Sequence, residues 1–320
     1  VGGLVTLRDL KQHTADWVEP VSASYRGYDV WELPPNGQGI AALQILNVLE
    51  QHDIAGMGHN SADFIHLYTE AKKLAFADRA KFYADPQVEK NLPIAEMISK
   101  PYAKRQAKRI DMAKAALRVP AGDPRLAKGD TIYLTAVDKE RNVVSLIQSN
   151  FYGFGSGHVP GNLGFAMQNR GTLFTMDENH HNRLEPNKRP FHTIIPAMVT
   201  RDGKPFLSFG VMGGDMQPQG HSQVLVNIID HGMNVQEASD AGRVRHDGSD
   251  TPTGDIMSDG GRLIVESGVS DEAVKELKKR GHNVTRGGAG GGYQAIRIDY
   301  ETGLLHGGSE ARKDGAAIGY

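Results

Sequence analysis

The chain has 320 residues, no cysteine and a formal charge of −2, from 36 basic and 38 acidic side chains that are mixed along its length. This balance argues against a nucleic-acid partner, and the lack of cysteine excludes disulfides, thiol nucleophiles and thiolate metal sites. No apolar run approaches the roughly 18 residues of a membrane-spanning helix, so we expect no membrane span.

The length leaves open whether the chain forms one large domain or two tightly joined pieces. Glycine accounts for 38 of the 320 residues, which is well above the usual share of roughly 7%. The glycines concentrate after residue 131. We therefore expect strands and tight loops in that part of the chain.

The first segments carry local signals for a short helix and a hairpin. Thr6 is a candidate helix cap, and Asp9 is placed to reach back to it as in a capping box. Residues 25–28 predict a tight turn between two strands. The second strand runs over residues 28–33 and stops at a pair of prolines.

Two longer helices are predicted next. Apolar residues at 40, 43 and 46 have the 3.6-residue spacing of a half-buried helix. A second apolar stripe runs from Phe64 to Ala75 and predicts a helix whose charged residues face away from the stripe; these are Glu70, Lys72, Lys73 and Arg79. Prolines at 86, 93 and 101 divide the following segment into short helices, and the polar, turn-rich residues 121–130 are typical of a linker.

After the linker the pattern changes to strands followed by helices. Two alternating runs predict a hairpin with a charged turn at residues 139–142. The predicted strands are 131–137, 143–148, 197–200, 205–210, 293–299 and 303–306, and the predicted helices are 221–231, 235–241 and 270–280. This order favours layered α and β structure over a doubly wound parallel sheet.

Five segments of this second part are typical of one known family when they occur in this order. They are Thr131 at the start of the first strand, Ser149, the glycine-rich residues 153–157, the Pro-Asn-Lys-Arg-Pro segment at 186–190, and Gly213-Gly214. With these segments the chain resembles the gamma-glutamyltranspeptidase family, including its cephalosporin (glutaryl) acylase-like members. The resemblance covers essentially all 320 residues.

The resemblance implies an α+β fold, the four-layer αββα sandwich of the N-terminal nucleophile hydrolases. It also implies that the chain begins inside the large subunit. Residues 1–130 would then be the mostly helical C-terminal part of that subunit, and residues 131–320 the small subunit that carries the nucleophile. The other fragment of its own precursor is an expected partner. The resemblance leaves open whether the protein forms a homo-oligomer and in which compartment it acts.

Thr131 is the position that matches the family nucleophile. A threonine hydroxyl is a weak nucleophile without a base, and a chain-terminal threonine supplies one in its own amine, with a pKa of roughly 7.7 to 8.0. The bond between Asp130 and Thr131 must therefore be cut first, by attack of the Thr131 hydroxyl on the Asp130 carbonyl. An isolated threonine usually just begins a strand, but the surrounding matches favour the catalytic role.

Two further groups are expected at the reacting centre. Gly213 and Gly214 follow a strand and match the glycines whose amide N–H groups stabilise the oxyanion, although a bare glycine pair is more often only a turn. Ser149 matches a family threonine that hydrogen-bonds the nucleophile. We therefore expect Thr131, Ser149, Gly213 and Gly214 to form the catalytic set.

The substrate-binding positions depart from the pattern of true gamma-glutamyl transferases. Phe151 and Leu173 replace an asparagine and an aspartate that hold the substrate's α-amino group, His192 and Thr193 replace a pair of serines, and Ile132 replaces the usual second hydroxyl residue. An ammonium buried without partners is costly. These changes argue against α-amino recognition.

Arg170 stands where the family commonly has an uncharged or acidic residue. Its guanidinium could bind the carboxylate of a glutaryl-type acyl chain in a bidentate manner. A structural salt bridge is an equally good explanation of the same residue. The segment 175–185 is also too short for the long lid of some relatives, so the site would admit water and bulky leaving groups.

These features together predict a self-processing N-terminal-threonine amidase or acyltransferase that cleaves gamma-glutamyl- or glutaryl-type amides, with hydrolysis favoured. The alternatives are a gamma-glutamyltransferase proper that acts on glutathione and, in another class, an uncleaved scaffold or binding protein without activity. The glycine run at 287–292 precedes a strand, which disfavours a dinucleotide loop. Histidines at 158, 180, 181, 192, 221 and 231 lack metal-ligand spacing, so we expect no metal and no cofactor.

Overall fold

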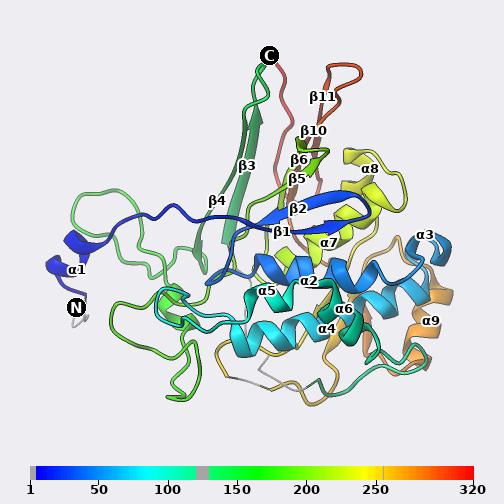
Figure 1. Ribbon diagram of the computed structural model, residues 1–320, viewed down its shortest axis with the longest axis horizontal. Helices are drawn as coiled ribbons and strands as arrows, with labels where there is room; N and C mark the ends of the chain where they lie inside the picture. Colours follow the sequence, from blue (N-terminus) through cyan, green and yellow to red (C-terminus); the bar gives the residue numbers. More distant parts are fainter. Residues whose placement is uncertain (1–4, 120–129, 255) are drawn as a thin grey trace.

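The computed structural model describes residues 5–119, 130–254 and 256–320, which form both helices and strands (Figure 1). The helices are α1 (Leu7–Gln12), α2 (Gly39–Leu49), α3 (Ile54–Met57), α4 (Ala62–Phe82), α5 (Ile94–Met97), α6 (Lys100–Ala107), the 3₁₀ turn η1 (Arg170–Leu173), α7 (Met216–Ile229), α8 (Val235–Asp240) and α9 (Asp271–Lys279). The strands are β1 (Val21–Tyr25), β2 (Tyr28–Glu32), β3 (Asp130–Val137), β4 (Val143–Phe151), β5 (Ala197–Arg201), β6 (Lys204–Val211), β7 (Val244–Asp247), β8 (Arg262–Val265), β9 (Val284–Arg286), β10 (Tyr293–Ile298) and β11 (Leu305–Ser309).

The central sheet has the strand order β1-β2-β5-β6-β10-β11, and all of its neighbouring strands are antiparallel. Strands β1 and β2 precede residue 130 and the other four follow it, so the two parts of the chain share one sheet. A three-stranded sheet, β7-β8-β9, lies apart from the central one. The antiparallel pairing of the central sheet, with separate runs of helices, confirms the predicted α+β class.

Strand β6 shows how the layers are stacked, because its side chains alternate between two faces. On one face, Ser208 bonds to Thr135 of β3 with the two hydroxyl oxygens 2.6 Å apart, and Gly210 leaves room for the Tyr133 ring. On the other face, the Phe209 ring packs on His221 of α7. The sheet therefore lies between a helical layer and the β3–β4 hairpin.

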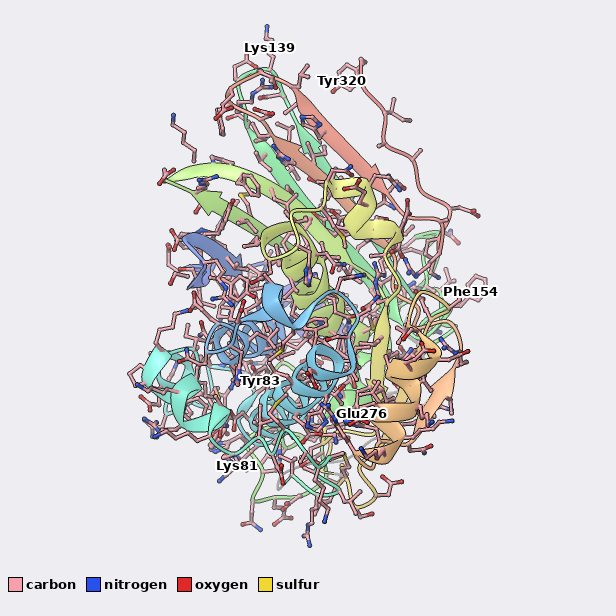
Figure 2. The ribbon with its side chains drawn as sticks, turned by 90° about the vertical axis from the view of Figure 1, so that its right-hand side faces the viewer. Lys81, Tyr83, Lys139, Phe154, Glu276 and Tyr320 are labelled. Carbon is pink, nitrogen blue, oxygen red and sulfur yellow. The ribbon has the colours of Figure 1, made fainter. Side chains whose placement is uncertain are left out.

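The β3–β4 hairpin projects beyond the helices (Figure 1), and Lys139 in its turn lies at one end of the molecule (Figure 2). Thr131 is at the opposite end of β3. Within the described ranges, the outer face of the hairpin carries exposed apolar side chains, namely Ile132, Leu134, Val144 and Leu146. On the inner face, Thr131 and Tyr133 of β3 are buried and most other residues are half-buried, so several of the alternating apolar residues lie on the exposed face instead.

Several helix boundaries agree with their local signals. Thr6 and Asp9 form the predicted capping box of α1, and Ser61 and Ser270 cap α4 and α9 through hydrogen bonds to backbone N–H groups three residues later. The prediction that a helix begins near residue 221 was wrong, because α7 begins at Met216.

The predicted burial of the two long helices was also wrong. Every residue of α2 is buried, since this helix packs against β1, β2, α4, α6 and α7 together. On α4, the four charged residues expected to face away are all buried as well, where they make polar contacts inside the protein. None of the described helices is long and apolar enough to cross a membrane.

Candidate active site

Thr131 and Ser149 face each other across the β3–β4 hairpin. They are paired residues in the strand register, and the Thr131 hydroxyl donates to the Ser149 Oγ over 3.3 Å. Ser149 Oγ also accepts the amide N–H of Phe151 at 2.9 Å. Thr131 is 7% exposed, and β3 runs through Asp130 and Thr131 as one strand with an irregular register between them. The hydroxyl is thus held beside the predicted scission bond.

The glycine pair forms a turn between β6 and α7. Both residues have left-handed φ values, 112° at Gly213 and 61° at Gly214, which glycine adopts without strain. The Gly213 carbonyl accepts the N–H of Met216 at 3.1 Å, and the Gly214 carbonyl accepts that of Gln217 at 3.1 Å. Among the described residues, no group accepts the amide N–H of either glycine. The turn therefore offers two donors of the kind that stabilise an oxyanion.

Arg170 is the charged residue of a group that we call the Arg170 cluster: the buried Phe151, Arg170 and Thr193, and the half-buried His192. The guanidinium donates from Nη1 to the Thr193 hydroxyl at 3.1 Å and lies 5.2 Å from the centre of the Phe151 ring. Burial lowers the pKa of Arg170 to about 10. Its Nη2 is buried and has no hydrogen-bond partner, and no carboxylate of the described chain pairs with it.

His192 is the second polar side chain of this cluster. Its backbone N–H donates to the Asn36 carbonyl at 3.0 Å, and its ring lies against Gly37, where an added Cβ would come within 2.8 Å of the ring. Burial, with the nearby cations Arg170 and Arg189, lowers the pKa of His192 to about 3. The imidazole is therefore neutral, and it adds no charge beside Arg170.

Leu173, at the position of the family aspartate, is fully buried at the end of η1. The positions of Phe151 and Leu173 thus provide aromatic and aliphatic surface rather than groups that could hold an ammonium. The side chain of Phe151 is 1% exposed and packs in the main core.

One residue that the sequence did not indicate connects the cluster to the glycine turn. The Gln38 side-chain amide donates to the Thr193 carbonyl at 2.8 Å and to the Gly214 carbonyl at 2.9 Å. An unbroken series of contacts therefore joins Thr131, through Ser149 and the Arg170 cluster, to the turn. A polar residue in the loop before an apolar helix was the one available signal for Gln38, and that signal is common in loops.

The glycine run at 287–292 borders the same turn. Gly291 Cα lies 3.4 Å from the position that a Cβ on Gly213 would take, and the Gly292 carbonyl accepts the N–H of Met212 at 2.9 Å. This run leads into β10 and packs closely on the turn. It serves as a close-packing loop beside the Gly213–Gly214 turn.

Three buried residues outside the site have metal-ligand chemistry. Ligand-type atoms of His66, Glu70 and His282 all lie within 4.8 Å of one another. They satisfy one another and their neighbours, however: His66 Nδ1 and His282 Nε2 are 2.8 Å apart, and the two Glu70 oxygens accept from Lys73 Nζ at 2.8 Å and from the Ala116 N–H at 3.2 Å. The group is best explained as a buried polar network between α4 and the residues after α9.

This network predicts an acid-sensitive contribution to stability. Burial lowers the pKa of His282 to about 3, below its unfolded value of roughly 6.5. The unfolded state therefore binds one proton more between these values. Above about pH 6.5 this residue does not affect the free energy of unfolding. As the pH decreases below about 6.5, protonation of this residue in the unfolded state should lower the free energy of unfolding by about 1.4 kcal/mol per pH unit. The variant His282→Gln keeps an N–H donor for His66. In urea unfolding between pH 6.5 and 4.5, its free energy of unfolding should depend less steeply on pH than that of the wild type.

The same substitution at the exposed His158 is the control for this measurement. It should leave the pH dependence of unfolding unchanged. An unaltered slope in His282→Gln would show that the histidine is not held neutral in the folded state.

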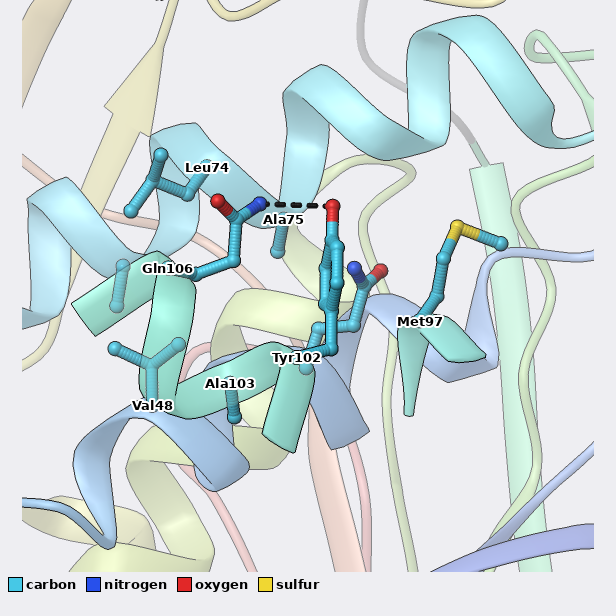
Figure 3. A pocket seen from close by; sticks show the side chains of 9 residues that line it. Val48, Leu74, Ala75, Met97, Tyr102, Ala103 and Gln106 are labelled. Atoms are coloured by element: carbon cyan, nitrogen blue, oxygen red, sulfur yellow. Dashed lines mark hydrogen bonds between the residues drawn. The ribbon is translucent and has the colours of Figure 1, made fainter. Parts of the chain in front are cut away.

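Figure 3 shows a small cavity among the helices, between Val48 of α2, Leu74 of α4 and Ala103 of α6. Its volume is about 10 Å³, which is room for about one water molecule. The drawn hydrogen bond, from Gln106 Nε2 to the Tyr102 hydroxyl, is 2.9 Å long. Since no predicted site residue lines it, this cavity is a gap in the helical scaffold.

Comparison with known proteins places these features in context. The family model described as Gamma-glutamyltranspeptidase matches residues 1–320. The chain is 39% identical over 325 residues to the glutathione hydrolase-like YwrD proenzyme of Bacillus subtilis (strain 168), covering 99% of the chain and 59% of that protein. It is 34% identical over 320 residues to the acylase ACY 1 proenzyme of Pseudomonas sp. (strain SE83), covering 99% of the chain and 54% of that protein.

Among solved structures, the crystal structure of cephalosporin acylase from Bacillus halodurans matches with a TM-score of 0.87 and 40% identity, covering 100% of the chain and 56% of that protein. A gamma-glutamyltranspeptidase from Pseudomonas nitroreducens, complexed with L-DON, matches 59% of the chain with a TM-score of 0.51 and 27% identity. The chain thus spans 54% to 59% of the length of the relatives that it matches over nearly its whole length.

Proposed function

The chain belongs to the gamma-glutamyltranspeptidase family, as its motifs predicted, and on this premise we propose that it is a self-processing amidase with Thr131 as its N-terminal nucleophile. The observation that carries the proposal is the series of contacts from the Thr131 hydroxyl to the Gly213–Gly214 turn. The series connects the proposed nucleophile, the proposed cationic binding group and the turn that bears the proposed oxyanion donors, all from distant parts of the sequence.

Processing would begin with attack of Thr131 Oγ on the Asp130 carbonyl carbon. The Asp130–Thr131 amide bond breaks as an ester to Oγ forms, and the freed nitrogen takes the hydroxyl proton. Water then hydrolyses the ester, which leaves a carboxylate on residue 130 and a free amine on residue 131. The products are residues 1–130, as the C-terminal part of a large subunit, and residues 131–320 as the small subunit.

The same groups would then serve turnover. The free amine of Thr131 accepts the proton of its own hydroxyl, and Oγ attacks the carbonyl carbon of the substrate amide. Amide N–H groups of Gly213 and Gly214 stabilise the oxyanion, while Ser149 orients the hydroxyl. The proton passes to the leaving amine, the acyl group stays on Oγ, and water hydrolyses this ester.

The Arg170 cluster supports a substrate whose acyl chain ends in a carboxylate. A buried guanidinium with an unpaired Nη2 is costly unless an anion binds it. A carboxylate that also accepts from Thr193 would supply that anion. Because Phe151 and Leu173 offer nothing to an ammonium, we propose glutaryl-type amides as the preferred substrates, with hydrolysis favoured over transfer.

Comparison of glutaryl- and gamma-glutamyl-p-nitroanilide tests this preference. We expect kcat/KM for the glutaryl compound to be higher by roughly tenfold or more, because the buried ammonium of the gamma-glutamyl compound lacks partners. Release of p-nitroaniline measures both reactions, and an excess of glycylglycine distinguishes transfer from hydrolysis. A strong preference for the gamma-glutamyl compound would refute the substrate assignment and leave the nucleophile untouched.

Glutathione is the second candidate substrate. The B. subtilis relative is described as a glutathione hydrolase-like proenzyme, and other relatives as glutathione hydrolase proenzymes. Glutathione carries the same gamma-glutamyl group, so it belongs in the same comparison. Release of cysteinylglycine at a rate above that of glutaryl hydrolysis would favour this candidate.

A further inference from the structure

We propose that Gln38 is a positioning residue that holds the oxyanion turn and the acyl-carboxylate site in one fixed arrangement. The inference rests on the proposed function, and it goes beyond it by assigning part of the catalytic geometry to the segment before residue 130. Gln38 is fully buried in the loop that precedes α2.

The groups around Gln38 determine the orientation of its side-chain amide. Arg79 Nη1 can only donate, and it lies 2.7 Å from Gln38 Oε1. The amide oxygen must therefore face Arg79, so the two N–H groups face the opposite way. There they meet two carbonyl oxygens, one of Thr193 at 2.8 Å and one of Gly214 at 2.9 Å.

The contact with Gly214 fixes the peptide group that follows the oxyanion donors. The next residue, Asp215, is fixed by Arg79 as well, with Nη1–Oδ1 and Nη2–Oδ2 distances of 2.5 and 3.2 Å. Arg79 is fully buried and packs over the Phe76 ring at 3.8 Å. These contacts hold the turn through the Gly214 carbonyl and the Asp215 carboxylate. The N–H groups of Gly213 and Gly214 have no acceptor among the described residues.

The contact with Thr193 connects the same amide to the substrate-binding side. Thr193 accepts the Arg170 guanidinium through its hydroxyl, while its carbonyl accepts Gln38. One side chain therefore sets the distance between the oxyanion donors and the group that would bind the acyl carboxylate. Gln38 and Arg79 lie before the predicted cleavage point and their partners after it, so the contacts would persist between the two fragments.

A pair of matched glutamine variants on the full chain tests the role. Gln38→Met keeps the length of the side chain and removes its hydrogen bonds. Gln44→Met makes the same change in α2, where the buried Gln44 bonds to Asp78 and Tyr83 and contacts no site residue. We expect Gln38→Met to lower kcat and the rate of self-cleavage by roughly tenfold to fiftyfold, because small displacements of catalytic groups have effects of this order.

Gln38→Met should lower kcat for a glutaryl anilide and for a butyryl anilide, since the oxyanion forms with both, and the loss should be larger for the glutaryl compound, because its carboxylate site also loses its fixed distance from the turn. Gln44→Met should keep kcat within about twofold, whatever it does to the melting temperature. Should Gln38→Met fail to fold, Gln38→Glu replaces the donor by an oxygen that repels both carbonyls and retains a partner for Arg79, and it should show the same loss.

Two results would overturn the inference: wild-type kcat in a folded Gln38 variant, or an equal loss of kcat in Gln44→Met. Thr131→Ala, measured beside them, separates this failure from a failure of the proposed function. If Thr131→Ala is inactive while Gln38→Met is fully active, the nucleophile stands and the positioning role falls. If Thr131→Ala is active, the proposed function falls first.

Discussion

Thr131→Ala is expected to leave the chain uncut at Asp130–Thr131 and without measurable amide hydrolysis. The substitution removes the oxygen that would attack in both reactions, and the uncut chain also lacks the free amine that would serve as base. Losses on the order of 10⁵ or more in kcat follow removal of a nucleophile in other acyl-transfer enzymes. Intact-mass analysis reports the cleavage, and p-nitroaniline release reports the turnover.

Two controls make this result specific. Thr135→Ala removes a hydroxyl from the same face of β3, where it bonds to Ser208 and not to any site residue; it should be cut and active. Thr131→Ser keeps a hydroxyl and should retain cleavage at a reduced rate. Normal processing or hydrolysis by Thr131→Ala would show that another residue is the nucleophile.

Arg170→Met is expected to lower kcat/KM for a glutaryl anilide by about a hundredfold and to leave a butyryl anilide within a few fold of the wild type. The guanidinium would form charge-assisted hydrogen bonds with the glutaryl carboxylate in a buried site, and the butyryl chain has no such group. Kinetics on the two anilides measure the difference. Equal losses on both would mean that Arg170 acts on structure and not on the carboxylate.

The stability of the same variant provides a second measurement. Arg170 has no carboxylate partner in the described chain, so its removal should hardly lower the free energy of unfolding. Arg243 is equally buried but pairs with Glu310 at 2.8 Å. Arg243→Met removes the shorter of the two contacts to Glu310 Oε2 and leaves it only Arg312 Nη1 at 3.2 Å, so it should lower the free energy of unfolding clearly more than Arg170→Met does. A large loss of stability in Arg170→Met would argue for a structural role.

Signals that act within a few residues were predicted correctly from the sequence. The capping box at Thr6 and Asp9, the helix that begins after Ser270 and the strand over residues 131–137 each depend on neighbours one turn or one strand away. The family membership was predicted in the same way, because the motifs and their order are properties of the sequence. These predictions do not require knowledge of how the elements pack.

Contacts between distant residues could not be predicted in this way. Gln38 bonds to carbonyls 155 and 176 residues further along the chain, and its position in a loop gives no hint of either. The burial of all of α2 had the same cause, since it depends on the number of elements that pack around the helix and not on its own periodicity.

The sequence by itself determined the family, the identity of the residues proposed for catalysis and many of the elements, although not the β7-β8-β9 sheet or the start of α7. The tertiary structure alone decided that Arg170 lies beside Thr193 with no carboxylate partner in the described chain, and that Gln38 connects this site to the Gly213–Gly214 turn. The physical reason is that local conformation depends on hydrogen bonds and side-chain spacing along a few residues. The partner of a buried polar group depends instead on which distant segments close packing brings to it.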